Sequence, residues 1–265
     1  MEVTVLDVGQ GLAVVVRTAS HTLLYDAGPP QSNEQDSGNR IIVPNLKAAG
    51  VRILDAMVIS HDDVDHTGGA ASVLALMPVR WMSTPLAADH HLLQNQQHVR
   101  CHAGQHWEWD GVRFEMLYPS PDSYEKAPVK DNDQSCVLRV ISQYGSILIP
   151  GDIEKAAEFS LVRSGQSLQS DVLIAPHHGS KTSSTEVFLD SVNPQLTIFT
   201  TGYRNRYRHP HQVVVKRYHA KHIPTFQSDR DGAILLNFSS NAGLQLTRWR
   251  SQYKRYWQVF DDKLL

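Results

Sequence analysis

The segment Ser60–Gly69 gathers four potential metal ligands within six positions. Two are imidazoles and two are carboxylates: His61, Asp63, Asp65 and His66. Imidazole and carboxylate together suit zinc, manganese or iron. Packing alone does not explain so many ionisable groups after an apolar run, because burying unpaired charge is costly in free energy. A solvated acidic turn is the alternative, but the density of ligands favours a metal site.

Two later segments deliver the same residue types in the same way. Asp152 follows the apolar run Ile147–Ile149, and the pair His177 and His178 follows Leu173–Ala175. Runs of this kind are typical of strands buried on both faces. A loop at a strand exit can point its side chains inward, and three such exits carry residues of metal-ligand type.

The surrounding pattern predicts strands and helices that alternate in both halves of the chain. We expect strands at 3–8, 12–17, 21–25, 54–60, 79–82, 106–109, 112–118, 135–142, 145–149, 172–175, 196–200, 232–237 and 243–249. We expect helices at 39–49, 68–76, 153–163, 185–191 and 213–222. This order predicts an α/β architecture of two sheets with outer helices.

Composition sets bounds on the class of protein. The 265 residues are 41% apolar and 20% charged with a formal charge of -2, typical of a soluble globular protein rather than a disordered or broadly DNA-coating one. We expect one domain, 1–265, with 251–265 as a tail or last helix. The apolar runs are too short to cross a bilayer, and the N-terminus reads as a strand rather than a signal peptide.

The chain has only two cysteines, Cys101 and Cys136. They are too few for a disulfide framework and lack the paired spacing of a thiolate zinc site. We therefore expect free thiols, with a single bridge between them as the alternative.

Together these motifs resemble the metallo-β-lactamase superfamily, and more narrowly the C-terminal domain of the ComEC/Rec2 competence proteins. The similarity extends from residue 3 to about residue 235. It is carried by Leu6–Gly11, Tyr25–Gly28, Ser60–Gly69, Gly151–Glu154, His177–Ser180, Asn205–Arg206, His209–Pro210 and Asp231–Ile234. The resemblance implies the metallo-β-lactamase fold, a four-layer αββα sandwich of two mixed sheets flanked by helices.

The resemblance also implies two divalent metal ions. His61, Asp63 and Asp152 would hold one ion; Asp65, His66, Asp152 and His177 would hold the other, so that Asp152 bridges the pair. His178 is the alternative to His177. The superfamily pattern has histidine where this chain has Asp63. A carboxylate makes the site harder and more anionic, which favours Mn²⁺ while leaving Zn²⁺ possible.

Further residues are expected around the ions. Asp26 would orient a ligand or hold a water, with an ordinary turn as the alternative. His178, Ser180 and Lys181 would contact a phosphate or protonate a leaving oxygen, and the resemblance implies that His209 approaches the site. Arg204, Arg206 and Arg208 are candidates for phosphate contact, with a solvated basic loop as the alternative.

Two neighbouring metals suit hydrolysis of a phosphodiester. The Gly9–Gly11 turn lacks the lysine of a nucleotide-binding loop, so we expect no nucleotide cofactor. The resemblance implies a deoxyribonuclease domain that degrades the non-transported strand during DNA uptake, with DNA, single-stranded in particular, as its partner. It also implies a periplasmic domain of an inner-membrane protein, next to the membrane channel part.

Two other functions remain open. One is a phosphodiesterase for small substrates of the choline-phosphoester type. Superfamily members that cleave choline phosphodiesters have similar sites with aspartate at the Asp63 position. The other is a non-catalytic DNA-guiding domain. A measurement of bound metal separates the DNA-guiding domain from the nuclease and the phosphodiesterase.

Overall fold

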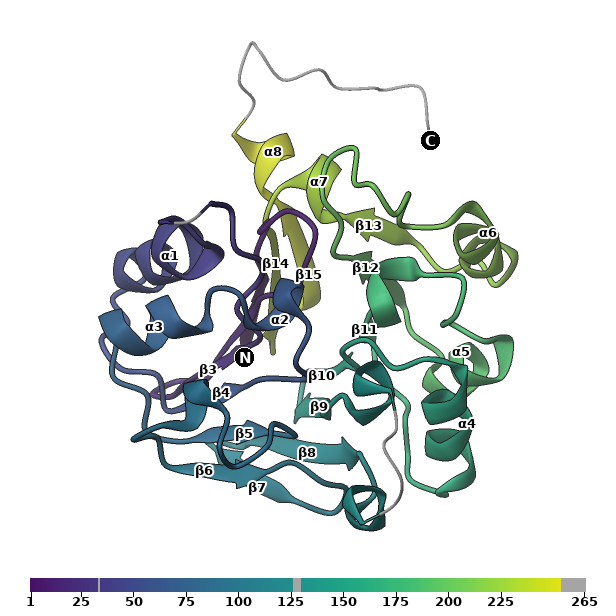
Figure 1. The fold of residues 1–265 in the computed structure, drawn as a ribbon. Helices are drawn as coiled ribbons and strands as arrows, with labels where there is room; N and C mark the ends of the chain where they lie inside the picture. The colour runs from purple at the N-terminus through teal and green to yellow at the C-terminus, as the bar shows by residue number, and fades with distance from the viewer. Residues whose placement is uncertain (33, 126–129, 254–265) are drawn as a thin grey trace.

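The computed structural model describes residues 1–32, 34–125 and 130–253. Two β-sheets pack face to face between two layers of helices (Figure 1). In Figure 1 the left flank carries α1 (Val43–Ala48) and α3 (Ala70–Leu76), and the right flank carries α4 (Lys155–Arg163), α5 (Glu186–Val192) and α6 (Gln212–Ala220). The four-layer αββα arrangement predicted from the sequence is confirmed.

The first sheet has eight strands and is mixed. In spatial order they are β15 (Gly243–Arg248), β14 (Ile234–Ser239), β1 (Glu2–Val5), β2 (Val14–Arg17), β3 (Thr22–Tyr25), β4 (Ala56–Val58), β5 (Met82–Thr84) and β6 (His98–Arg100). Neighbours from β15 to β3 pair antiparallel, and those from β3 to β6 pair parallel. The switch falls where helices enter the connections, as parallel pairing requires.

The second sheet repeats this plan with seven strands. Their order is β13 (Thr225–Gln227), β12 (Leu196–Phe199), β11 (Val172–Ile174), β10 (Gly145–Ile149), β9 (Val137–Ser142), β8 (Val112–Tyr118) and β7 (His106–Trp109). Strands β10 to β13 pair parallel, and β10 to β7 pair antiparallel. In the parallel half of each sheet the strands run in the same direction, so their C-terminal ends and the loops that follow lie at one edge of the sheet.

Three buried apolar clusters explain why the strand segments are almost continuously hydrophobic. In β4, Ala56 and Val58 face the core between the sheets, whereas Met57 packs under the helices of the first flank. In β10, Ile147 faces the central core and Leu148 packs under α4 to α6. Burying a side chain of this size stabilises the fold by about 1.5–3 kcal/mol, so the register of both strands is fixed and with it the place where the next residues emerge.

Several boundaries differ from the predicted ones. The helix expected at 39–49 begins as a wide turn at Gly38–Ile42 before α1, and the helix expected at 68–76 is preceded by a separate one-turn helix, α2 (Val64–Thr67). The strand expected at 79–82 is β5. Strands β6 and β13 were missed because each holds a single apolar residue, Val99 or Phe226, and so gives no apolar run. Helix α8 (Trp249–Gln252) begins before the tail expected at 251–265 and overlaps its start, and residues 254–265 of that tail fall outside the described ones.

The expectation of free thiols was wrong. Cys101 and Cys136 form a disulfide, and both residues are fully buried. Cys101 follows β6 of the first sheet and Cys136 precedes β9 of the second, so the bridge joins the two sheets. The backbone N–H of Cys136 also donates to Ser60 O at 3.0 Å, beside the histidine and aspartate segment. Sequence spacing gave no signal for this pairing because it depends on how the sheets face each other.

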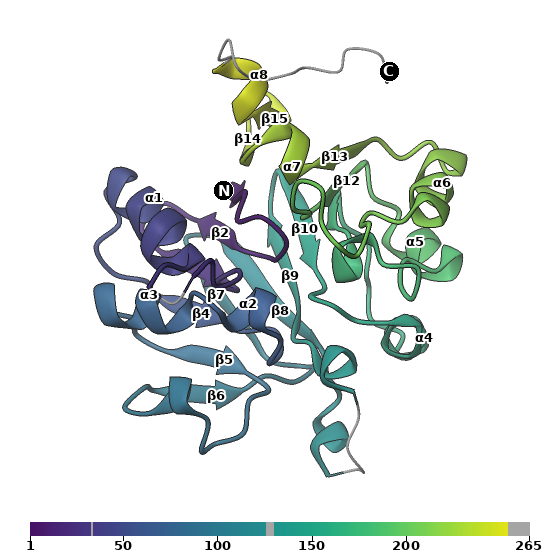
Figure 2. The ribbon, with the colours of Figure 1, turned by 45° about the horizontal axis from the view of Figure 1, so that its top comes forward.

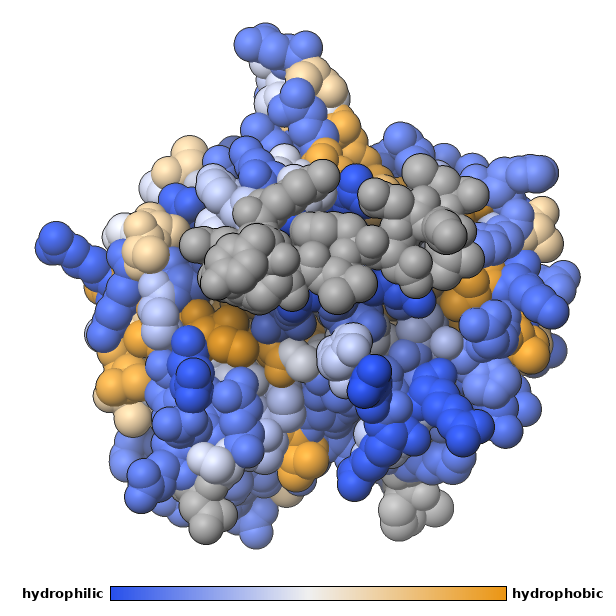
Figure 3. Space-filling view, turned by 90° about the horizontal axis from the view of Figure 1, so that it is seen from above, coloured by the Kyte–Doolittle hydropathy of each residue, from blue (hydrophilic) through white to orange (hydrophobic). Residues whose placement is uncertain are grey.

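No helix among the described residues is long and apolar enough to cross a membrane. The face seen from above in Figure 3 is predominantly hydrophilic, with hydrophobic residues in separate patches. Such a face suits polar or charged ligands.

We predict that the Cys101→Ser, Cys136→Ser variant loses about 2–4 kcal/mol of unfolding free energy, because the bridge closes a loop with a sequence separation of 35. Urea unfolding with and without dithiothreitol measures this. Reductant should lower the midpoint of the wild type and leave the double variant unchanged. The disulfide would be contradicted if reductant left the wild-type midpoint unchanged and if two thiols could be alkylated after unfolding without reductant.

Candidate metal centre

Strand exits from both sheets converge on one group of ionisable side chains. The loop after β4 carries His61 to His66, the loop after β10 carries Asp152, and the turn after β11 carries His177 and His178. Figures 1 and 2 show α2, which holds Asp65 and His66, between the two helical flanks. The structure thus brings the three strand exits together.

Two overlapping sets of ligand-type atoms lie within 4.8 Å of one another: His61, His66 and Asp152, and Asp65, His66 and His178. His66 Nε2 lies 3.2 Å from Asp152 Oδ1 and 3.2 Å from His178 Nε2. His178 Nε2 is 3.4 Å from a carboxylate oxygen of Asp65 and of Asp152. We call these five residues the ligand cluster; His66 belongs to both sets.

The donor set fits a divalent metal ion. His61 Nε2 is buried and makes no well-aligned hydrogen bond among the described residues, although Asp63 Oδ2 lies 3.3 Å away. The Nε2 atoms of His66 and His178 face each other at a distance where two N–H groups would repel. Buried polar atoms without partners are costly, and a cation between these nitrogens and the carboxylates would satisfy them together. Nitrogen and carboxylate oxygen are ligands that Zn²⁺ and Mn²⁺ accept.

Asp26 orients the cluster from behind. It is fully buried, accepts from the Ser60 N–H and Oγ at 2.7 Å each, and lies 2.7 Å from His66 Nδ1. A carboxylate there holds the Nδ1 proton of His66, which leaves Nε2 free to bind a metal. Of the two roles expected for Asp26, the geometry favours orienting a ligand.

Glycine makes this arrangement possible. The Ala27 N–H donates to His66 O, and a Cβ on Gly69 would lie only 2.3 Å from Ala27 O. The ligand loop and the Asp26 loop therefore touch through their backbones. The Gly68-Gly69 pair of the motif permits that contact.

The cluster carries strong opposing charges. Although burial opposes ionisation of Asp152, the imidazoles of His178 and His66 hold its pKa well below the usual range. Burial also opposes ionisation of Asp65, but its hydrogen bond with His178 and the charge of His66 lower its pKa to about 2. Against the effect of burial, Asp152 and Asp26 raise the pKa of His66 well above its usual value. The carboxylates and imidazoles of the cluster thus favour each other's charged forms.

The predicted ligands Asp63 and His177 lie at the edge of the cluster. Asp63 Oδ2 is 3.3 Å from His61 Nε2, but its side chain is 48% exposed. His177 Nε2 is 3.7 Å from Asp152 Oδ2, whereas His178 is closer to Asp152 and almost fully buried. Of the two adjacent histidines, the geometry favours His178 as the ligand.

His209 approaches the cluster from the loop before α6. Its ring lies 5.9 Å from that of His177 and 6.5 Å from that of His178. Burial, with the neighbouring charges of His178 and His177, lowers the pKa of His209 to about 4. His209 is therefore a neutral imidazole near pH 7.

The residues predicted to contact a phosphate fall into one buried residue and several exposed ones. Ser180 is buried, and its Oγ lies 3.0 Å from Thr182 Oγ1. Lys181 is exposed, as are Arg204, Arg206 and Arg208. The exposed cations remain free to reach a ligand.

Sequence reasoning missed three polar neighbours of the cluster. Ser60 Oγ lies 2.9 Å from His61 Nδ1, Thr200 Oγ1 lies 2.9 Å from His178 Nδ1, and Asn132 Nδ2 lies 3.4 Å from His177 Nε2. Ser60 and Thr200 both follow buried strands, so the rule that located the ligands would also have located them. Asn132 gave no such signal.

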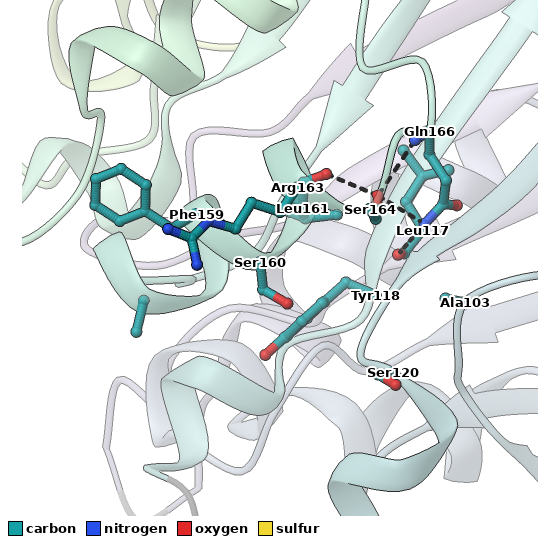
Figure 4. Close-up of a pocket in the computed structure, with 11 residues that line it drawn as sticks. Ala103, Leu117, Tyr118, Ser120, Phe159, Ser160, Leu161, Arg163, Ser164 and Gln166 are labelled. Carbon is teal, nitrogen blue, oxygen red and sulfur yellow. Dashed lines mark hydrogen bonds between the residues drawn. The ribbon is translucent and has the colours of Figure 1, made fainter.

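A cleft of about 500 Å³ lies elsewhere, between α4 and the end of β8 (Figure 4). Tyr118, Ser120, Phe159 and Arg163 are among its lining residues, and none of the cluster residues lines it. The chemistry of the ligand cluster therefore does not take place in this cleft.

Comparisons with known proteins agree with the motifs. The model of the metallo-beta-lactamase superfamily matches residues 6–199. The chain is 41% identical to "Competence protein ComA" of Neisseria gonorrhoeae over 97% of this chain and 35% of that protein, and 31% identical to "Recombination protein 2" of Haemophilus influenzae over 97% and 31%. It thus spans about a third of the length of the curated relatives it matches.

Among solved structures, a metallo hydrolase from Ignicoccus hospitalis has a TM-score of 0.57 at 12% identity, covering 90% of this chain and 100% of that one. This likeness concerns the fold. The resemblance to ComEC/Rec2 competence proteins is confirmed by the curated relatives, and the family match, which covers most of the chain, shows that this protein belongs to the metallo-β-lactamase superfamily.

Proposed function

We propose that this chain is a metal-dependent phosphodiester hydrolase that cuts DNA. The observation that carries the proposal is the buried ligand cluster, in which His66 and Asp152 lie within reach of both the His61 side and the His178 side. Such an arrangement suits two ions that share a carboxylate. Divalent ions held there would polarise a phosphodiester and activate water.

The ligands we assign are His61, Asp65, His66, Asp152 and His178, with Asp63 and His177 at the rim. Mn²⁺ is favoured over Zn²⁺ by Asp63, a carboxylate at the rim where the superfamily pattern has histidine, because it makes the site harder and more anionic. Asp26 fixes the orientation of His66, and His209, a neutral imidazole beside the cluster, is placed to accept a proton or a hydrogen bond. Ser180 and Lys181 follow His178 after Gly179 and are candidates for contact with a phosphate.

DNA as the substrate is supported by charge and by the relatives. Arg204, Arg206 and Arg208 are exposed on the loop that ends at His209, so phosphates bound there would lie beside the cluster. A deep, uncharged pocket at the cluster would favour a small phosphodiester, whereas the loop beside the cluster is exposed and basic. The curated relatives are named for competence and recombination.

The place of action we propose is the periplasmic side of an inner membrane, next to the channel part of a longer protein. Degradation of the strand that is not transported would be its role in DNA uptake. The Cys101–Cys136 bridge supports an oxidising compartment, because thiols stay reduced in the cytosol.

We predict that apparent metal affinity rises between pH 6 and pH 8. The raised pKa values of His66 and His178 mean that the metal-free site holds protons below those values, and a metal must displace them. Each displaced proton should change the affinity by about tenfold per pH unit. Calorimetric titration with Mn²⁺ and Zn²⁺ in buffers of different ionisation heat measures the affinity at each pH and the number of protons released.

The matched control is Asp62→Asn, because Asp62 lies in the same loop but is exposed and pairs with His90. This variant should bind like the wild type, whereas His66→Ala should lose binding. A pH-independent affinity, or equal binding by both variants, contradicts the ligand assignment.

We further predict that metal-stripped protein cuts labelled DNA only after Mn²⁺ or Zn²⁺ is restored. Asp65→Ala, His66→Ala should abolish cleavage, and Asp26→Asn should lower it about 10–100-fold by disturbing the orientation of His66. Asp62→Asn should cut at the wild-type rate. Protein that binds two metals but leaves DNA intact would instead indicate a small-substrate phosphodiesterase, and protein without bound metal would indicate a DNA-guiding domain.

A further inference from the structure

The loop Tyr203–Arg208 exposes two aromatic rings that packing does not explain. The residues Tyr203 and Tyr207 are 73% and 50% exposed. The guanidinium carbon of Arg204 lies 5.2 Å from the centre of the Tyr203 ring, and that of Arg206 lies 4.8 Å from the centre of the Tyr207 ring. An arginine above an aromatic ring is attracted by it. We call Tyr203–Arg208 the aromatic–basic loop.

Tyr207 is the outer end of a series of nearly parallel rings that leads to the ligand cluster. Its ring lies 5.7 Å from that of His209 with an interplanar angle of 24°, and His209 lies 6.5 Å from His178 at 22°. His178 contacts both Asp65 and Asp152. A flat group that stacks on Tyr207 would therefore extend this series outward from the cluster.

The loop is held in place at its neck. Asn205 Nδ2 donates to the carbonyls of Gly202 and His209, and Asn205 Oδ1 accepts from the His209 N–H at 2.8 Å. The Gly202 N–H donates to Gln10 Oε1, which ties the loop to the other sheet. A platform that is already ordered loses less conformational entropy when a ligand binds.

We propose that Tyr207, with Tyr203 on the same loop, is a stacking platform for unpaired bases, so that single-stranded DNA is the preferred substrate. This inference rests on the proposed DNA hydrolysis at the ligand cluster. An aromatic ring stacks on any base, so the platform is independent of sequence. A paired base in duplex DNA keeps its faces stacked on its neighbours and cannot use it.

The arginines complete this assignment. Arg206 lies on the Tyr207 ring in the free protein, and rotation of its side chain carries the guanidinium to a phosphate of the stacked nucleotide. Arg204 has the same relation to Tyr203. Each aromatic ring is thus paired with a cation of its own, as expected for a strand whose bases and phosphates alternate.

The test is fluorescence anisotropy of metal-free protein in chelator, which separates binding from cleavage. The probes are an oligothymidylate of about 15 nucleotides, within the reach of such sites, an abasic oligonucleotide of the same length, and the corresponding duplex. The variants are Tyr207→Ala and Tyr207→Phe. The matched control is Tyr144→Ala, since Tyr144 is a 38% exposed tyrosine in the turn before β10, at the opposite end of that strand from Asp152.

We expect Tyr207→Ala to weaken binding of the oligothymidylate by about 5- to 100-fold and to leave binding of the abasic probe unchanged. Tyr207→Phe and Tyr144→Ala should bind like the wild type. The inference is overturned if Tyr207→Ala binds the oligothymidylate normally, or if it loses affinity for both single strands alike, because the ring would then serve only the shape of the loop. Either result leaves metal-dependent cleavage intact, whereas a wild type that binds none of the probes removes the DNA-hydrolase proposal as well.

Discussion

The structure depends on the burial of opposite charges where the two sheets meet. Asp152 and His66 lie 3.2 Å apart, both almost completely removed from water, with Asp26 behind and Asp65 and His178 in front. Buried ions are stable only when they are paired and hydrogen-bonded. The strand exits, the disulfide between the sheets and the backbone contacts around Gly69 all hold these groups together. They do so although removing charged groups from water costs free energy.

The same constraint explains why the cluster belongs to two sheets rather than to one. His61, Asp65 and His66 come from the exit of β4, and Asp152 and His178 come from β10 and β11. Each sheet contributes its ligands through the rigid end of a parallel segment. The Cys101–Cys136 bridge and the hydrogen bond from Cys136 to Ser60 link the sheets next to this point. A small shift between the sheets would therefore separate one half of the site from the other.

Sequence reasoning located most of these parts because the physical signals were local. Apolar runs such as Ile147–Ile149 marked strands, and the ionisable residues after them marked the exits. The family resemblance added the expectation that His66, Asp152 and the histidine pair share one site. What sequence reasoning missed depends on contacts across the fold. The disulfide, the short strands β6 and β13, and the preference for His178 over His177 follow from how distant segments face each other. Thr200 was missed although the strand-exit rule applied to it.

The central claim is that the buried cluster holds two metal ions that share Asp152. Anomalous diffraction from crystals grown with Mn²⁺, measured at the manganese edge, tests this most directly. The account predicts two anomalous peaks inside the cluster, with carboxylate oxygens of Asp152 within bonding distance of both and with His61 Nε2 and His178 Nε2 on opposite sides. Peaks confined to exposed histidines such as His91 and His98, with none in the cluster, would contradict it.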